Sequence, residues 1–565
     1  MPQKIFTLLK TAAGNLWIGL QSLIQRFKLN DHWLILALVL GLILGAQGFN
    51  WGNYDCLNKD KMAFQNIFSK DRLPFQPSRY VKPPFYTYAC HFAARVPAMT
   101  ISSLFFWKKS HERYGIFLKI RLWLARTLNL CMFVCCTIAI FIIVGEFFSK
   151  SAARVAALLF ATSSGFIPYQ IFLTTDLAVV FMMLASFLFA LKIINNPSIF
   201  NSVMAGLLAG LAAATKYNGL AVAVALPLAH ILAGNSGNLL FKAIRRPSSW
   251  ICGICVPLGF ILGNPYCLFD WYQFKKDFLY NYTVTPVYNG ATSGTGYTLF
   301  FESFFEIFGT PGSIIIFSSC VIGLLSIILQ SKKTNAWKVW LLSLAVFALY
   351  AYKIGSFPRM ETRFVLPAAP FLLILASVGF VQLSKVKPLF LPLVAGLLVY
   401  NLICGYFIGQ IFINDPRNYV STFADQRLQH GGIVEWSKSL PKLEGLPEKL
   451  KIFEIEGGLE RTAMFQKMFA ENAEILDTVN KKESQRTPDW FSVENRKLRN
   501  PDYVMWCSIE LEDIVKNHFD ALFKESSGYR VIYDATTKEI PSWVYPQRTE
   551  FTRNRTTIWE KIPSV

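Results

Sequence analysis

The stretch WLILALVLGLILGAQGF, residues 33–49, is followed directly by NWGNYDCLNKDKMAF, residues 50–64. The first part is an apolar run that predicts a helix entering a bilayer. The second part is polar and places two carboxylates, Asp55 and Asp60, just beyond the end of that helix. Further along the chain, Lys82 comes immediately before a Pro-Pro turn. We expect the carboxylates and this lysine to face one cavity at the membrane surface.

Apolar runs of this kind recur along the whole chain of 565 residues, of which 53% are hydrophobic and 16% charged. This composition is too apolar for one soluble core, and it predicts a polytopic α-helical membrane protein. Eleven runs predict about eleven transmembrane helices, at residues 33–49, 127–145, 155–173, 177–194, 203–215, 217–233, 250–263, 313–329, 339–352, 365–383 and 389–411. Several are shorter than the ~20 residues that span a bilayer, so we expect some to lie among their neighbours or to end inside a cavity.

The distribution of basic residues predicts the orientation, because basic loops stay on the cytoplasmic side. If residues 85–107 stay in the outer interface, the loops on the N-terminal side carry 15 bases against two acids, Asp31 and Glu146. The opposite loops carry six bases and six acids. We therefore expect a cytoplasmic N-terminal segment, residues 1–32, and one long first exoplasmic loop, residues 50–126. Residues 85–107 would form a re-entrant or surface helix in that loop, unless they cross the membrane.

The last part of the chain, residues 412–565, has a different composition and is predicted to be exoplasmic. Strand-like and helix-like segments alternate in it, which predicts a small α/β domain. The expected strands are residues 450–455, 503–506, 529–533 and 557–562, and the expected helices are residues 458–470 and 511–523. Residues 33–411 would form the transmembrane catalytic module.

The net charge of +20 could indicate nucleic-acid binding. The basic residues, however, sit in short clusters between apolar runs, where anionic lipid headgroups and membrane orientation explain them. No basic stripe lies on a soluble domain, so we expect membrane lipids and no nucleic acid as partners. Seven of the 11 cysteines lie inside apolar runs, without the neighbours that a metal or redox site needs.

Ionisable residues recur at the predicted outer ends of the membrane helices, notably Asp176, Lys216, Arg359 and Arg363. A lysine or arginine there can extend its charged end toward the lipid headgroups, which is the purely structural interpretation of such a residue. A carboxylate extends less well, so Asp176 is harder to explain in that way. An outer cavity with both signs of charge suits a substrate with a lipid tail, a phosphate and a polar head.

Five short motifs follow one another along the chain, and each is a weak signal by itself. They are Lys82-Pro-Pro-Phe-Tyr, Thr174-Thr-Asp176, GLLAGLAAATKYN at residues 206–218, Asn264-Pro-Tyr with Asp270, and Arg363-Phe-Val-Leu-Pro367. In this order the chain resembles the GT-C glycosyltransferases, over roughly residues 33–411. The most similar branch is glycosyltransferase family 39, which includes the protein O-mannosyltransferases and the lipid A aminoarabinose transferase.

The resemblance implies a polyprenyl-phosphate sugar as donor, inversion at the anomeric carbon, and an acceptor that is a glycan, a lipid or a protein. The outer-loop acid of the family maps to Asp60, which would be the general base, with Asp55 in reserve and Asp176 as a further catalytic residue. Lys61 stands where the family often has a second acid. The cations expected to hold the donor phosphate are Lys82, Lys216 and Arg363, with Arg359 in reserve.

No Asp-x-Asp pair occurs in the chain, so we expect a metal-independent enzyme without a cofactor. The expected role is cell-envelope glycosylation in a bacterial cytoplasmic membrane, with the active site on the exoplasmic face. A transporter or lipid flippase is an alternative, although the sequence has no inverted repeat. An inactive relative that serves as a scaffold is a second alternative, because of Lys61.

Overall fold

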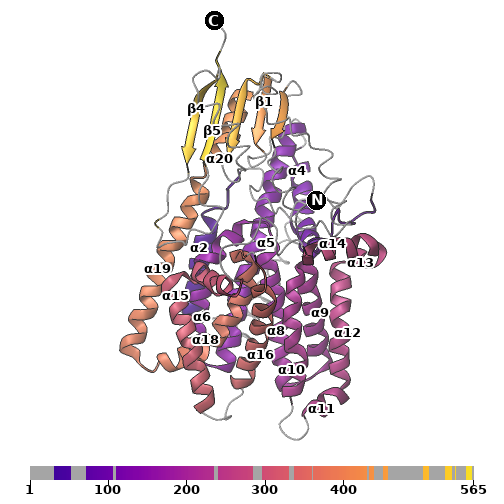
Figure 1. Cartoon of the computed structure of the whole chain (residues 1–565), viewed down its shortest axis with the longest axis vertical. Helices are drawn as coiled ribbons and strands as arrows, with labels where there is room; N and C mark the ends of the chain where they lie inside the picture. The colour runs from indigo at the N-terminus through magenta and orange to yellow at the C-terminus, as the bar shows by residue number, and fades with distance from the viewer. Residues whose placement is uncertain are drawn as a thin grey trace, which may run out of the picture.

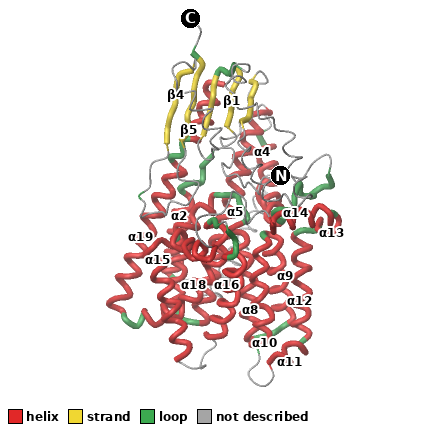
Figure 2. The backbone as a smooth tube through the Cα atoms, in the orientation of Figure 1, coloured by secondary structure: helices red, strands yellow, loops and turns green. Residues whose placement is uncertain are grey.

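The structure is a computed structural model. It describes residues 31–52, 72–105, 110–233, 239–283, 296–329, 336–358, 360–428, 432–437, 450–455, 500–507, 529–536, 541 and 555–562. Figure 1 shows a bundle of helices with a β-sheet at one end, and Figure 2 shows the same division by secondary structure.

Each of the eleven apolar runs contains a helix, which confirms a mostly helical protein. Six helices of the described chain are long and apolar enough to cross a membrane, at Arg113–Phe147, Asp176–Asn195, Gly296–Leu329, Ala336–Gly355, Thr362–Leu383 and Phe390–Val420. Four shorter apolar helices are His32–Ala46, Ile199–Thr215, Tyr217–Leu232 and Pro247–Gly263. The number of eleven membrane crossings stays a prediction.

The principal bundle helices and their bounds are α2 (His32–Ala46), α5 (Ser110–Phe147), α6 (Lys150–Thr162), α8 (Asp176–Asn195), α9 (Ile199–Thr215), α12 (Pro247–Gly263), α15 (Gly296–Leu329), α16 (Ala336–Gly355) and α19 (Lys387–Ile413). Helix α9 lies unusually close to α12 because its interface side carries glycine. A Cβ at Gly210 would lie 2.1 Å from the carbonyl oxygen of Val256. Close backbone approach through small residues is a common way to join membrane helices. It gives α9, which ends next to Lys216, a rigid support.

Three of the predicted runs are broken rather than continuous. The first is α6, the 3₁₀ turn η3 (Ser164–Phe166) and α7 (Ile167–Ile171); the second is η4 (Tyr217–Val224) and α10 (Ala225–Leu232); the third is α17 (Thr362–Val365), η5 (Leu366–Ala368) and α18 (Ala369–Leu383). Pro168 and Pro367 lie at two of the breaks and cannot donate a backbone hydrogen bond. Each break adjoins a predicted site residue: Asp176, Lys216 or Arg363.

Helix α15 is kinked at Gly309, whose φ of 71° is in the left-handed region that favours glycine. Pro311 lies two residues later and cannot serve the carbonyl of Ile307. The hydroxyl of Ser164 donates to that carbonyl at 3.4 Å and to the carbonyl of Glu306 at 3.3 Å. The carbonyl groups at the kink therefore accept a hydrogen bond from Ser164 of η3. The kink also sets the position of Glu306.

The described part of the predicted first outer loop beyond residue 84 is helical for most of its length. It contains α3 (Phe85–Cys90), the π-helical turn η2 (His91–Arg95) and α4 (Val96–Ser103), and α5 begins at Ser110 rather than at residue 127. The expected start of that helix was wrong because charged residues interrupt the apolar pattern over residues 110–126 although the helix continues through them. Helix α4 packs on α5 and lies at the end of the molecule that carries the sheet (Figure 1).

Three short helices extend from the bundle. They are α11 (Leu239–Arg245), α13 (Tyr266–Phe269) and α14 (Trp271–Thr283). Figure 1 shows α13 and α14 beside the upper ends of α9 and α12, on the side of α4, whereas α11 lies at the opposite end of the bundle. Helices α13 and α14 are thus on the same side of the bundle as the first outer loop.

The C-terminal region contains a five-stranded sheet of order β2-β1-β3-β5-β4. Its strands are β1 (Gly432–Ser437), β2 (Leu450–Ile455), β3 (Tyr503–Cys507), β4 (Tyr529–Thr536) and β5 (Arg555–Lys561). Strand β1 pairs in parallel with β2 and β3, whereas β5 pairs antiparallel with β3 and β4. Helix α20 (Arg417–Arg427) packs its Val420 and Phe423 against the sheet residues Val434, Met505 and Ile558.

Four of these strands confirm the sequence prediction, whereas β1 was not expected. The predicted helices 458–470 and 511–523 lie outside the described residues. The division into a membrane module and a separate C-terminal α/β domain stays a prediction.

Candidate active site

A buried ion pair joins two of the predicted site residues at the end of the bundle that carries the sheet. Asp176 is the first residue of α8, and Lys216 follows the last residue of α9. The Nζ atom of Lys216 lies 2.6 Å from Oδ1 of Asp176. The aspartate is 2% exposed. A buried carboxylate requires a partner of this kind, so the pair explains how Asp176 is tolerated there.

Lys216 keeps capacity for a second interaction. Its backbone is extended, with φ −156° and ψ 129°, so the side chain leaves the helix and its ammonium lies 5.6 Å from the centre of the Phe364 ring. An ammonium has three donors. Among the described residues, Asp176 is the one hydrogen-bond acceptor of this group. Two donors are therefore available for an anionic ligand.

Arg363 lies on the same aromatic ring. Its guanidinium carbon is 5.6 Å from the centre of the Phe364 ring, and it forms an ion pair with Glu361. It also interacts electrostatically with Asp176. Two of the predicted phosphate-binding cations, from helices far apart in sequence, thus converge on Phe364.

Hydrogen bonds that the sequence did not predict hold Phe364 in place. The hydroxyl of Tyr350 on α16 donates to the carbonyl oxygen of Phe364 at 2.8 Å. The side-chain amide of Asn218 donates to the same hydroxyl at 2.5 Å. Asn218 belongs to the motif of residues 206–218, but nothing in the sequence pattern pointed to Tyr350, which lies in an apolar run of α16.

A second buried carboxylate, Glu306 of α15, lies next to this group. It is 3% exposed and accepts a hydrogen bond from the hydroxyl of Thr362, the residue before Arg363. The sequence prediction treated Glu306 only as one of the acids in an outer loop. Its position depends on the kink at Gly309, which the apolar pattern does not reveal.

The start of the first outer loop is fixed by Arg126 of α5, a fully buried arginine. Its guanidinium donates to the carbonyl oxygens of Phe49 at 2.5 Å, of Trp51 at 2.7 Å and of Ile171 at 3.2 Å. Residue 171 ends α7, five positions before Asp176. Arg126 therefore holds the start of the loop against the segment that leads to Asp176.

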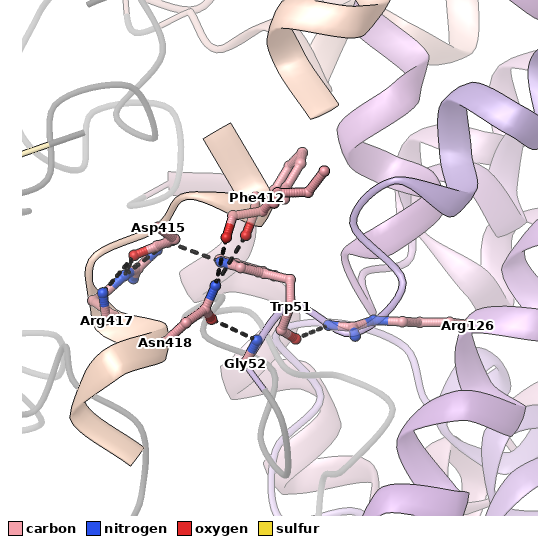
Figure 3. A network of polar contacts seen from close by, with 8 residues as sticks. Trp51, Gly52, Arg126, Phe412, Asp415, Arg417 and Asn418 are labelled. Atoms are coloured by element: carbon pink, nitrogen blue, oxygen red, sulfur yellow. Dashed lines mark hydrogen bonds and ion pairs between the residues drawn. The ribbon is translucent and has the colours of Figure 1, made fainter. Parts of the chain in front are cut away.

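Figure 3 shows the rest of this connection. The indole N–H of Trp51 donates to Oδ2 of Asp415 at 2.8 Å, and the amide of Gly52 donates to the side chain of Asn418 at 3.1 Å. Asp415 is also paired with Arg417 at 2.5 Å. These residues join the end of α19 to the start of the loop that carries Asp55 and Asp60.

The remaining predicted site residues have different outcomes. Asp55, Asp60 and Arg359 lie outside the described residues. Lys82 is half-buried, and its segment is joined to that of Lys216 by a hydrogen bond of 2.5 Å from the hydroxyl of Tyr217 to the carbonyl oxygen of Tyr80. The structure thus brings together Asp176, Lys216 and Arg363, and it brings the chain near Lys82 to the same end.

Comparison with known proteins shows what this chain is similar to. Residues 114–261 match the family model described as dolichyl-phosphate-mannose-protein mannosyltransferase. No curated protein matches the sequence. The crystal structure of ArnT from Cupriavidus metallidurans bound to undecaprenyl phosphate is similar, with a TM-score of 0.51 and 12% identity, over 94% of this chain and 98% of that chain.

Two structures of the oligosaccharyltransferase from Archaeoglobus fulgidus also match. The apo form has a TM-score of 0.45 and 13% identity over 85% of this chain and 70% of that chain. The complex of AglB with an inhibitory peptide and a dolichol-phosphate has a TM-score of 0.42 and 14% identity over 84% and 69%. The resemblance to the GT-C glycosyltransferases is confirmed by the family match and by the similarity of the fold to that of ArnT.

Proposed function

We propose that this protein is a membrane glycosyltransferase that moves a sugar from a polyprenyl-phosphate donor to an acceptor hydroxyl on the exoplasmic face, with inversion. The observation that carries the proposal is the convergence of Lys216 and Arg363 on the Phe364 ring. Both cations have buried or partly buried surroundings, where charge-assisted hydrogen bonds to a phosphate are strong. The family match of residues 114–261 supports a transferase, and the undecaprenyl phosphate bound to ArnT supports a lipid phosphate as the donor's carrier.

The cations would act on the leaving group. As the bond between the anomeric carbon and the phosphate oxygen breaks, its electron pair passes to the phosphate, and negative charge grows there. Lys216 and Arg363, with Lys82 as the third cation, would stabilise that charge without reorganising during the reaction. Asp176 holds the Lys216 ammonium at 2.6 Å, so we assign it the orientation of this lysine.

The base would come from the first outer loop. Asp60, or Asp55 in its place, would take the proton of the acceptor hydroxyl as its oxygen attacks the anomeric carbon. Attack on the side opposite the phosphate inverts the configuration. Arg126 supports this assignment, because it holds the start of the loop next to the segment that leads to Asp176.

The proposal also covers the donor sugar and the acceptor. The donor sugar would be a hexose or a pentose, and the acceptor a glycan, a lipid or a protein of the cell envelope. The long first outer loop and the C-terminal sheet lie at the same end of the molecule as the site (Figure 1). We therefore expect the acceptor to bind between them and the bundle.

Lipid and glycan extracts from cells with and without the gene, compared by mass spectrometry, would test the function. We expect one glycosylated species to be lost, and to return with the intact gene but not with Lys216→Ala. Detergent-solubilised protein should then transfer the sugar when given the donor lipid from those extracts. A transporter would need two compartments, so the absence of transfer in detergent, with donor and acceptor both present, would contradict the proposal.

Cysteine labelling would test the side of the membrane. Ser103 on α4 and Lys385 after α18 are both exposed, and they lie at opposite ends of the bundle in the proposed topology. In intact cells an impermeant thiol reagent should label Ser103→Cys and leave Lys385→Cys unlabelled, after subtraction of the wild-type signal. The reverse pattern would place the site on the cytoplasmic side.

A further inference from the structure

The segment from Pro74 to Tyr80, through which the first outer loop returns to the bundle, forms no helix or strand. Its backbone groups need hydrogen-bond partners from elsewhere. A surface loop normally finds them in water. Here, side chains from helices provide some of them: the hydroxyl of Tyr266 donates to the carbonyl oxygen of Pro74 at 2.5 Å, and the hydroxyl of Tyr88 donates to the carbonyl oxygen of Phe75 at 2.7 Å. The side chain of Gln76 also donates to the side chain of Asp270 at 3.0 Å.

Tyr80 is the centre of this arrangement. Its side chain is fully buried, and its ring packs edge-on against Phe274 of α14 at 5.8 Å. Its hydroxyl donates to Asp270 at 3.2 Å, and its backbone N–H donates to Oδ2 of Asp277 at 2.6 Å. Its backbone carbonyl accepts the hydroxyl of Tyr217 at 2.5 Å. Both backbone groups of one residue are therefore held by different parts of the bundle.

The positions of these contacts along the chain are informative. Tyr217 is the neighbour of Lys216, and Tyr80 precedes Lys82 by two residues, a span of at most about 7 Å along the backbone. The Tyr217–Tyr80 hydrogen bond is thus a short link between two of the cations assigned to the donor phosphate. Asp277 holds the other side of Tyr80, and its second oxygen accepts Gln273 at 2.9 Å, which orients the carboxylate.

We propose that Tyr217 and Asp277 are positioning residues that hold Lys82 against Lys216, so that both ammonium groups bind one phosphate. This inference rests on the proposed function. It goes further by assigning the geometry of the phosphate site to a tyrosine hydroxyl and to a carboxylate of α14, neither of which contacts the donor.

A double-mutant cycle on the full-length protein in detergent would test it, with undecaprenyl phosphate as the binding probe and undecaprenol as the phosphate-free control. Tyr217→Phe keeps the ring and removes one hydrogen bond, so we expect about 5- to 10-fold weaker binding of the phosphate lipid. Binding of undecaprenol should not change. In the Lys82→Ala background, Tyr217→Phe should weaken binding less than about 2-fold, because its effect acts through Lys82.

Asp277 gives a second measurement. Asp277→Ala should weaken binding of the phosphate lipid, and Asp277→Asn, which keeps an acceptor oxygen for the Tyr80 N–H, should restore most of it. Tyr272→Phe is the matched control, because Tyr272 is on the same helix but 74% exposed. It should bind like the wild type.

Amide hydrogen exchange of residues 76–82 helps to separate the positioning role of Tyr217 and Asp277 from the proposed phosphate site. Tyr217→Phe and Asp277→Ala should both speed exchange of this segment, with or without lipid. If Lys82→Ala itself weakens binding but Tyr217→Phe is equally harmful with and without Lys82, the positioning role is wrong. If neither Lys82→Ala nor Lys216→Ala affects binding, the proposed phosphate site is wrong, whatever the exchange shows.

Discussion

Two buried ion pairs at opposite ends of the helical bundle use the same chemical groups in different ways. At the end where α6 begins, Asp31 accepts the backbone N–H of Trp33 at 3.0 Å and two guanidinium nitrogens of Arg154 at 2.8 and 3.0 Å, with Lys150 at 3.4 Å. At the other end, Asp176 pairs with Lys216 at 2.6 Å and also interacts with Arg363 and Thr174.

The difference separates a structural pair from a binding pair. Around Asp31 both carboxylate oxygens are occupied by donors, so the pair is complete without a ligand. Around Asp176, two donors of the lysine have no acceptor in the part of the chain that the structure describes, and a second cation, Arg363, lies on the same ring. Burial of the carboxylate alone would not distinguish them, because Asp31 and Asp176 are 3% and 2% exposed. The hydrogen bonds around each pair do distinguish them.

The largest expected effect is on turnover, which should depend on the proposed base and not on Asp31. Asp60→Asn should keep the fold and the binding of donor but lower turnover at least ~10²-fold, because it removes the proposed base. Asp31→Asn should leave the turnover of the folded protein near that of the wild type. Single-turnover kinetics of both variants would check this. Normal turnover in Asp60→Asn with an inactive Asp55→Asn would move the base to Asp55.

The second-largest expected effect is on the binding of undecaprenyl phosphate. Lys216→Ala should weaken binding of undecaprenyl phosphate by about 1 to 3 kcal/mol, the size of a charge-assisted hydrogen bond. Lys82→Ala and Arg363→Ala should do the same. Lys150→Ala is the matched control at the Asp31 pair, since the side chain of Lys150 is 64% exposed and lies 3.4 Å from a carboxylate that is already paired. Equal loss in Lys150→Ala and Lys216→Ala would abolish the distinction between the two pairs.

The free energy of unfolding should depend on the Asp31 pair, whereas lipid binding should not. Arg154→Ala removes the bidentate partner of Asp31 and should lower the free energy of unfolding by about 1 to 2 kcal/mol, with Lys150 still near the carboxylate. Binding of undecaprenyl phosphate to the remaining folded protein should be unchanged. Thermal unfolding in detergent, measured beside lipid binding, would show both. A variant with lost binding and intact stability would contradict the structural role.

The smallest expected effect is on pH dependence. Asp31 precedes α2 and so lies outside the membrane-spanning helix. Burial raises the pKa of Asp31, but the hydrogen bond and charge of Arg154, the Trp33 N–H and Lys150 outweigh it, and its pKa lies below the ordinary value of 3.8. A lowered folded-state pKa gives stability that is present above the unfolded-state pKa and is lost as the pH falls toward the folded-state value.

The difference in thermal stability between wild type and Asp31→Asn should therefore be constant above about pH 5 and should shrink below pH 4. Thermal unfolding curves from pH 3 to 6 would measure it. A difference that grows as the pH falls would mean that the aspartate is not stabilised in its charged form.

The sequence predicted the helices well because burial in a membrane leaves a strong apolar pattern. It missed the features that depend on polar residues in helices. Residues 110–126 are helical without an apolar pattern, and Arg126 is buried because it binds three backbone carbonyls from distant segments. Similarly, β1 is short and gains its stability from parallel partners on both sides, which a local pattern does not show.

The candidate site was predicted in part for a related reason. Charges at predicted helix ends identified Asp176, Lys216 and Arg363, since a charge in a membrane helix is costly and therefore conspicuous. Glu306 was not recognised because its position depends on the kink at Gly309. Tyr350 and Tyr217 act through hydroxyl groups whose partners are backbone carbonyls, and no spacing in the sequence predicts such contacts.

The contact between Trp51 and Asp415 sets an order of events during synthesis of the protein. The two residues are separated by 364 positions. At about 5 to 20 residues per second, the ribosome needs roughly 20 to 70 s to make the intervening chain. During that time the start of the first outer loop lacks its partners Asp415 and Asn418. The contacts of Trp51 and Gly52 with Asp415 and Asn418 can therefore form only after α19 has been made, later than the hydrogen bonds from Arg126 to the same part of the loop.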